Sequence, residues 1–211
     1  DIDNFIGDGV MAFFEGARRE LAACRSAMEI QEAMAREKEL AQAGGGEALD
    51  IRIGIHTGPV VFGSFGAKDR MALTSIGDTV NLASRLEGAN KEYGTKSLIS
   101  GAVYTRIREH YLCREIDVIF VKGKRQPVRI YEMLQEQKKA DDKARELKKV
   151  FELGLALYRQ RRWEDAEKAF RFLARRHRDE ASAVFLPRIA HFRKVPPPAG
   201  CPKAHWPAVV H

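Results

Sequence analysis

The chain has 211 residues, 45% of them hydrophobic and 31% charged, which is typical of one or two globular domains. No run approaches the roughly 20 consecutive apolar residues that a membrane-spanning helix needs. The net charge of +7 comes from residues 136–211, where acidic residues lie among the cations without a nucleic-acid-binding motif, so we expect solvated helix faces and no nucleic-acid partner.

The first predicted element is a β-hairpin over residues 4–14, where two apolar runs flank Gly7-Asp8-Gly9. An aspartate at such a tip is most often a turn residue, and it can also bind a hard cation such as Mg²⁺. Residues 17–43 then carry apolar side chains mostly three or four positions apart, which predicts a helix that ends at Gly44-Gly45-Gly46.

Two further strands are predicted over residues 51–63, around a Thr57-Gly58-Pro59 turn. Residues 76–86 follow as a turn that continues into a helix. At its start, Asp78 or Thr79 is placed to cap the first free backbone N–H groups.

Asn81 and Arg85 lie four residues apart on this helix, so their side chains project from one face. An amide and a guanidinium in that arrangement are suited to orienting a sugar and neutralising a phosphate as charge develops there. The alternative is that Asn81 faces water and Arg85 pairs with Glu87 or Glu92.

The next elements are a short strand, a short helix and a closing hairpin, over residues 97–99, 102–109, and 111–121 with 128–134. Within that hairpin Lys122 and Lys124 flank Gly123, which lets a ligand approach the backbone. The chain's three cysteines are widely spaced, which favours the reduced thiols of a cytoplasmic protein over a disulfide framework or a zinc site.

The polar residues 135–143 read as a linker to a helical segment over 144–195. Its apolar spacing resembles one tetratricopeptide hairpin with Arg161-Arg162-Trp163 at the turn, followed by a third helix. Because one repeat cannot bury a core alone, we expect it to pack on the preceding domain, on a partner chain or on another protein. Residues 196–211, rich in proline and without periodicity, are predicted to be disordered.

Taken in order, the Gly-Asp hairpin, the Thr-Gly-Pro strands, the Asn81–Arg85 helix and the Val-Lys-Gly-Lys segment resemble the class III nucleotidyl cyclases over residues 1–134. The resemblance implies an α/β fold, an α+β ferredoxin-like palm, here followed by a small all-α segment. It also implies a head-to-tail homodimer with active sites at the interface. The implied reaction converts ATP to 3′,5′-cyclic AMP and pyrophosphate, with two Mg²⁺ or Mn²⁺ ions assisting attack of the ribose 3′-hydroxyl on the α-phosphate.

The resemblance also assigns roles to individual residues. Asp8 matches the second of two metal-binding aspartates, and Asn81 matches the asparagine that orients the ribose. Arg85 matches the arginine that stabilises the pentavalent phosphate, and Lys122 matches the lysine that holds the terminal phosphates. With these roles, the resemblance implies that the chain is part of an adenylate cyclase, a phosphorus–oxygen lyase that acts in signal transduction.

Asn4 and Thr74 fall at the two positions that read the base in this family. Asn4 stands where adenylate cyclases usually carry a lysine and guanylate cyclases a glutamate, so it matches neither. Thr74 is a known variant in adenylate cyclases, whereas guanylate cyclases favour cysteine there. Thr74 therefore favours ATP as substrate, with GTP as the alternative.

The family's first metal aspartate normally lies on a strand well upstream of the Gly-Asp hairpin, and Asp8 is only the eighth residue here. We therefore expect a catalytic domain that lacks its first strand and first helices, with little activity from these 211 residues alone. Two other classes stay open: a pseudo-cyclase that binds nucleotide or dimerises without turnover, and a scaffold whose helical segment binds another protein.

Overall fold

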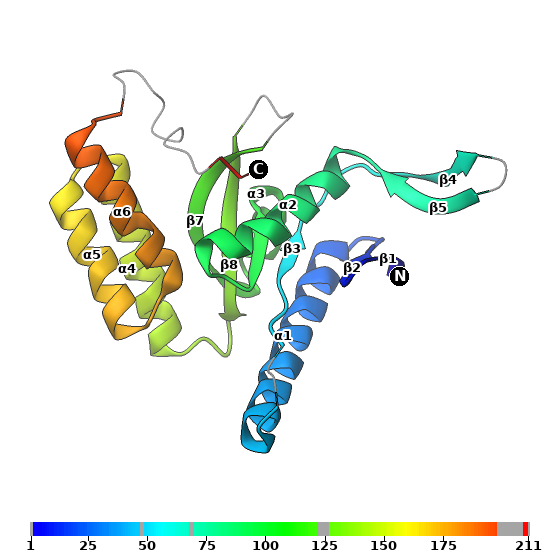
Figure 1. Ribbon diagram of the computed structural model, residues 1–211, viewed down its shortest axis with the longest axis horizontal. Coiled ribbons are helices and arrows are strands. Elements are labelled where there is room, and N and C mark those ends of the chain that lie inside the picture. Colours follow the sequence, from blue (N-terminus) through cyan, green and yellow to red (C-terminus); the bar gives the residue numbers. More distant parts are fainter. Residues whose placement is uncertain (1, 47–48, 68–69, 122–126, 198–208, 211) are drawn as a thin grey trace.

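A computed structural model describes residues 2–46, 49–67, 70–121, 127–197 and 209–210, with the backbone alone described for 2–6, 62–67, 70–76, 121 and 209–210. A β-sheet separates two groups of helices (Figure 1). Within the described ranges, no helix combines the length and apolarity needed to cross a bilayer.

The central sheet has the strand order β3-β6-β8-β7-β9. Its members are β3 (Ile53–Ile55), β6 (Ser97–Ser100), β7 (Tyr111–Val121), β8 (Val128–Glu136) and β9 (Val209–Val210). Strand β8 pairs antiparallel with both β6 and β7, whereas β3 runs parallel to β6. With the helices that cover both faces, this sheet confirms the predicted mixed α/β fold.

Strand β9 lies in the segment predicted to be disordered. Its two residues pair in parallel with Phe120 and Val121 of β7. The exposed edge of β7 offers unpaired backbone groups, and any nearby extended segment can satisfy them.

Two hairpins lie outside the central sheet. Strands β1 (Ile2–Ile6) and β2 (Gly9–Ala12) pair around the Gly7-Asp8 turn, as predicted. Strands β4 (Val61–Ala67) and β5 (Arg70–Ile76) form an arm that projects away from the helices (Figure 1). The two strands predicted around Thr57-Gly58-Pro59 exist as β3 and β4, but they belong to different sheets because β3 pairs with β6 and β4 with β5.

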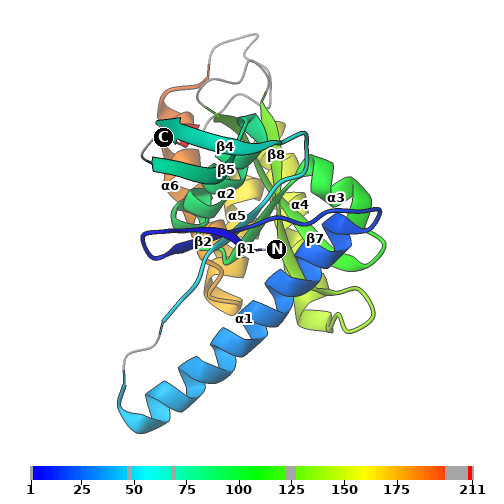
Figure 2. The same cartoon turned by 90° about the vertical axis from the view of Figure 1, so that its right-hand side faces the viewer.

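Helices α1 (Arg19–Gly44) and α3 (Gly101–Ile107) pack on one face of the sheet. The α1 boundaries confirm the predicted helix, and Gly45 ends it in the left-handed conformation, with φ of 73°. Figure 2 shows its second half extending beyond the sheet. The core beneath the two helices contains Cys24, Ala27, Ile99, Val103, Ile107, Tyr111, Cys113, Tyr131 and Met133.

The opposite face carries α2 (Asp78–Tyr93) together with α4 (Asp142–Arg159), α5 (Trp163–Arg176) and α6 (Glu180–Lys194). One continuous core joins these four helices to the sheet, with Phe151, Phe170 and Phe185 packed edge-on or stacked at its centre. The predicted packing of the helical segment on the preceding domain is confirmed, because α4–α6 share this core with the sheet.

Candidate functional site

Helix α2 presents the amide and the guanidinium that the sequence singles out. Asn81 is exposed near its start, and Arg85 is half-buried one turn later. The helix is continuous from Asp78 to Tyr93, so the four-residue spacing places the two side chains on the same side. The first part of the predicted site therefore forms a solvent-accessible pair of hydrogen-bond donors.

The start of α2 is fixed differently from the prediction. Gly77 occupies the N-cap position, and among the described residues no side chain caps the first turn. The Thr79 hydroxyl instead donates to the Pro59 carbonyl oxygen at 2.7 Å. The capping role predicted for Asp78 or Thr79 is thus wrong, because Thr79 is needed to tie α2 to the Thr57-Gly58-Pro59 segment.

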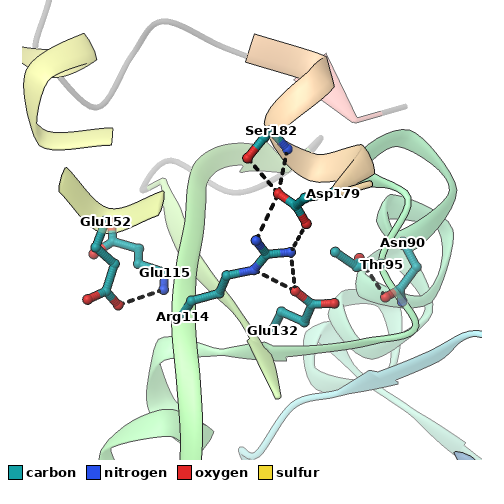
Figure 3. Close-up of polar contacts among 8 residues, drawn as sticks. All are labelled: Asn90, Thr95, Arg114, Glu115, Glu132, Glu152, Asp179 and Ser182. Atoms are coloured by element: carbon teal, nitrogen blue, oxygen red, sulfur yellow. Dashed lines mark hydrogen bonds and ion pairs between the residues drawn. The ribbon is translucent and has the colours of Figure 1, made fainter. Parts of the chain in front are cut away.

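A buried amide fixes α2 near its C-terminal end. Asn90 is 1% exposed, and its Nδ2 donates to the Ile53 carbonyl oxygen at 3.0 Å and to the Leu86 carbonyl oxygen at 2.9 Å. Its Oδ1 accepts from the Thr95 hydroxyl at 2.9 Å (Figure 3). Sequence analysis missed Asn90, although a polar residue on the buried stripe of Leu86 and Tyr93 was the available signal.

Strand β3 meets the backbone of α2 at Gly54. A Cβ placed there would lie 2.2 Å from the Ala83 carbonyl oxygen and 2.3 Å from the Glu87 nitrogen. No side chain fits this gap, so the glycine sets the distance between the sheet and the helix that carries Asn81 and Arg85.

We expect Gly54→Ala to lower the free energy of unfolding by about 1–3 kcal/mol or more, because the added methyl group forces α2 off the sheet. Gly88→Ala is the matched control, since Gly88 lies on the same helix with open space around it. Helix propensity there predicts a gain of about 0.5–1 kcal/mol. Urea unfolding of both variants measures the difference, and equal effects would contradict the close approach.

Asp8 lies at the exposed tip of the β1–β2 hairpin, and Gly7 beside it adopts φ of 63°. Its carboxylate is therefore accessible to a cation. Among the described residues, no three His, Cys, Asp or Glu side chains gather as a ready-made metal site. One exposed carboxylate fits Mg²⁺ or Mn²⁺ only where other oxygen atoms, such as those of a nucleotide, complete the coordination.

The remaining predicted site residues are placed only in part. Asn4 is in β1 opposite Met11, and Thr74 is in β5 opposite Gly63. Their side chains, and the whole of Lys122, lie outside the described residues. His56, which is not one of the predicted site residues, has its Nδ1 2.7 Å from the Ser100 hydroxyl oxygen.

The chain is similar to known proteins in both sequence and fold. The model of the family described as "Adenylate and Guanylate cyclase catalytic domain" matches residues 4–135. The chain is 40% identical over 137 residues to adenylate cyclase 1 of Rhizobium meliloti, an alignment that covers 63% of this chain. It spans only 21% of that relative's length.

Solved structures agree in fold. The adenylyl cyclase CyaB from P. aeruginosa superposes with a TM-score of 0.57 at 36% identity, covering 66% of this chain and 74% of that one. The guanylate cyclase domain of RhGC from Catenaria anguillulae, in complex with GTP, gives a TM-score of 0.52 at 27% identity. It covers 64% of this chain and 72% of that one.

Proposed function

Because the chain belongs to the family of adenylate and guanylate cyclase catalytic domains, we propose that it converts ATP to 3′,5′-cyclic AMP and pyrophosphate within its full-length protein. The observation that carries this proposal is helix α2, which presents Asn81 and Arg85 on one side while its other side is fixed to the sheet. Preorganised donors of this kind stabilise charge that develops on a phosphate.

In the proposed site, Asn81 orients the ribose and Arg85 meets the charge on the α-phosphate during attack by the 3′-hydroxyl. Lys122 holds the terminal phosphates. Asp8, exposed at its hairpin tip, supplies one metal-binding carboxylate. A bound Mg²⁺ or Mn²⁺ would polarise phosphate oxygens as a Lewis acid. We propose that two copies of the chain form a homodimer and that each active site draws residues from both.

The direct test is production of cyclic nucleotide by the full-length protein with ATP and Mg²⁺ or Mn²⁺. We expect cyclic AMP and pyrophosphate in equal amounts. Nucleotide binding without product would instead support the pseudo-cyclase, and absence of both would support the scaffold. The same assay with GTP in place of ATP decides between the two purines.

Asn4→Lys is expected to sharpen a modest preference for ATP over GTP by about one to two kcal/mol, or roughly five- to thirtyfold in relative kcat/KM. An amide can present either a donor or an acceptor, so it rejects the wrong base weakly. A lysine only donates, which suits the unprotonated ring nitrogen of adenine and opposes the ring N–H of guanine. The measurement is kcat/KM for both nucleotides, and an unmoved ratio would remove Asn4 from base reading.

A further inference from the structure

Two buried polar groups and a partly buried arginine, from three different elements, meet at the C-terminal end of α2. Arg188 of α6 places its Nη1 2.7 Å from Oδ2 of Asp117 on β7, and the same oxygen accepts from the Tyr93 hydroxyl at 2.8 Å. Arg188 Nη2 lies 3.5 Å from that hydroxyl oxygen. The Asp117 side chain is 8% exposed and Tyr93 is fully buried, so the contact is shielded from water.

A bulge in β7 makes this contact possible. The pairing register with β8 shifts between Glu115 and Asp117, which changes the alternation of side chains along the strand. Arg114 before the shift and Asp117 after it consequently both meet the helices on the same face. An unbroken alternation would have turned Asp117 to the α1–α3 face, away from Arg188.

The start of α6 is held by a second buried network. Arg114 Nη1 and Nη2 donate to the two carboxylate oxygens of Asp179 at 3.0 and 2.7 Å, and its Nε donates to Glu132 at 2.7 Å (Figure 3). Asp179 also caps α6 by accepting from the Ser182 nitrogen at 2.9 Å. These contacts hold the first turn of α6 against the sheet. They therefore also fix the position of Arg188, two turns later, relative to Tyr93.

We propose that Arg188 is a positioning residue for the cyclase reaction, acting through Asp117 and Tyr93 on the orientation of α2. The helix is continuous over its 16 residues, so a shift at Tyr93 is passed along it to Arg85 and Asn81. The helical segment is then part of the catalytic scaffold. This inference rests on the proposed function of α2.

The test compares Arg188→Met with Arg193→Met in the full-length protein. Arg193 lies one turn later on α6 and pairs with Glu167 while 46% exposed, so it is the matched control. We expect Arg188→Met to lower kcat about tenfold to a hundredfold with KM changed less than about threefold, because displaced reacting groups lose rate steeply. Arg193→Met should leave both constants unchanged.

A double variant separates positioning from stability. Asp117→Asn in the Arg188→Met background removes the buried negative charge that no cation then balances, so it should restore the melting temperature. If Arg188 positions α2, kcat should stay low in the double variant, because the guanidinium contacts to α2 are still missing. Return of kcat together with stability would overturn the proposal and leave Arg188 a purely structural residue.

Amide hydrogen exchange tests the same inference without turnover. Arg188→Met should speed exchange at residues 89–93 of α2 at least about tenfold, and Arg193→Met should not. If the wild-type protein makes no cyclic nucleotide, the proposed function fails while exchange still decides whether Arg188 holds α2. Unchanged exchange in α2 would overturn the positioning role whatever the activity.

Discussion

Replacing Arg85 with alanine in the full-length protein is expected to lower kcat at least about a hundredfold while changing KM far less. The proposed partner of the guanidinium is charge that appears on the phosphate mainly in the transition state, so its loss costs rate more than substrate binding. Steady-state kinetics with ATP over a range of concentrations separates the two constants.

Arg52→Ala is the matched control for Arg85→Ala. Arg52 also carries its charge beside α2, where its Nε lies 2.9 Å from Glu87 in an exposed ion pair. Exposed pairs contribute about 0–1 kcal/mol, so this change should leave folding and kcat nearly intact. If Arg85→Ala changes kcat as little as Arg52→Ala does, Arg85 is only a surface residue of the helix.

Local patterns predicted the elements whose shape depends on neighbouring residues. The apolar spacing of residues 17–43 sufficed for α1, and the Gly7-Asp8-Gly9 turn sufficed for the first hairpin. The spacing of Asn81 and Arg85 placed both on one side of α2. Each of these predictions depends on residues within a few positions, where helix and turn geometry leave few choices.

Contacts between residues far apart in the chain were not predicted from the sequence. The three-residue strand β3 pairs with β6, more than 40 positions away, and no local signal names that partner. Gly54 and Asn90 together fix α2 to β3, yet each is unremarkable until the strand and the helix are brought together. The packing of α4–α6 on the sheet was left among three alternatives because apolar periodicity shows that a face is buried without showing what covers it.

Buried charges were the least predictable feature. Arg114 is 2% exposed although an arginine in a strand normally signals a solvent-facing position. Its partners Glu132 and Asp179 are 18 and 65 residues away along the chain, so neither pairing is visible as a local motif. The roles of Asp8, Asn81, Arg85 and the base-reading positions stay predictions that mutagenesis must test.

Replacing Arg114 with methionine is expected to lower the free energy of unfolding by about 3–5 kcal/mol, the range for removing one partner of a buried ion pair. The two carboxylates that share the guanidinium, Glu132 and Asp179, would then face each other without a cation. Arg162→Ala is the control, because that arginine pairs with Asp165 while 59% exposed and should cost about 0–1 kcal/mol. Denaturant unfolding of the three proteins gives the comparison.

The loss of unfolding free energy in the Arg114→Met variant should become smaller as the pH falls. Burial raises the pKa of Asp179, but the hydrogen bonds and charge of Arg114, helped by Ser182, outweigh that effect and hold it below its ordinary value. Burial raises the pKa of Glu132 even with Arg114 present.

Without the guanidinium both folded-state pKa values rise above the unfolded ones. The folded variant then binds more protons than the unfolded chain and gains stability on acidification. In the wild-type protein Asp179 has a lowered pKa, so the stability that it contributes is fully present at both about pH 8 and about pH 5.5 and is lost only at more acidic pH. Unfolding at about pH 8 and about pH 5.5 should therefore show a smaller difference between variant and wild type at the lower pH. A difference that is constant or larger at the lower pH would mean that Arg114 stabilises the fold mainly by packing on Phe151, whose ring centroid lies 4.6 Å from its guanidinium carbon.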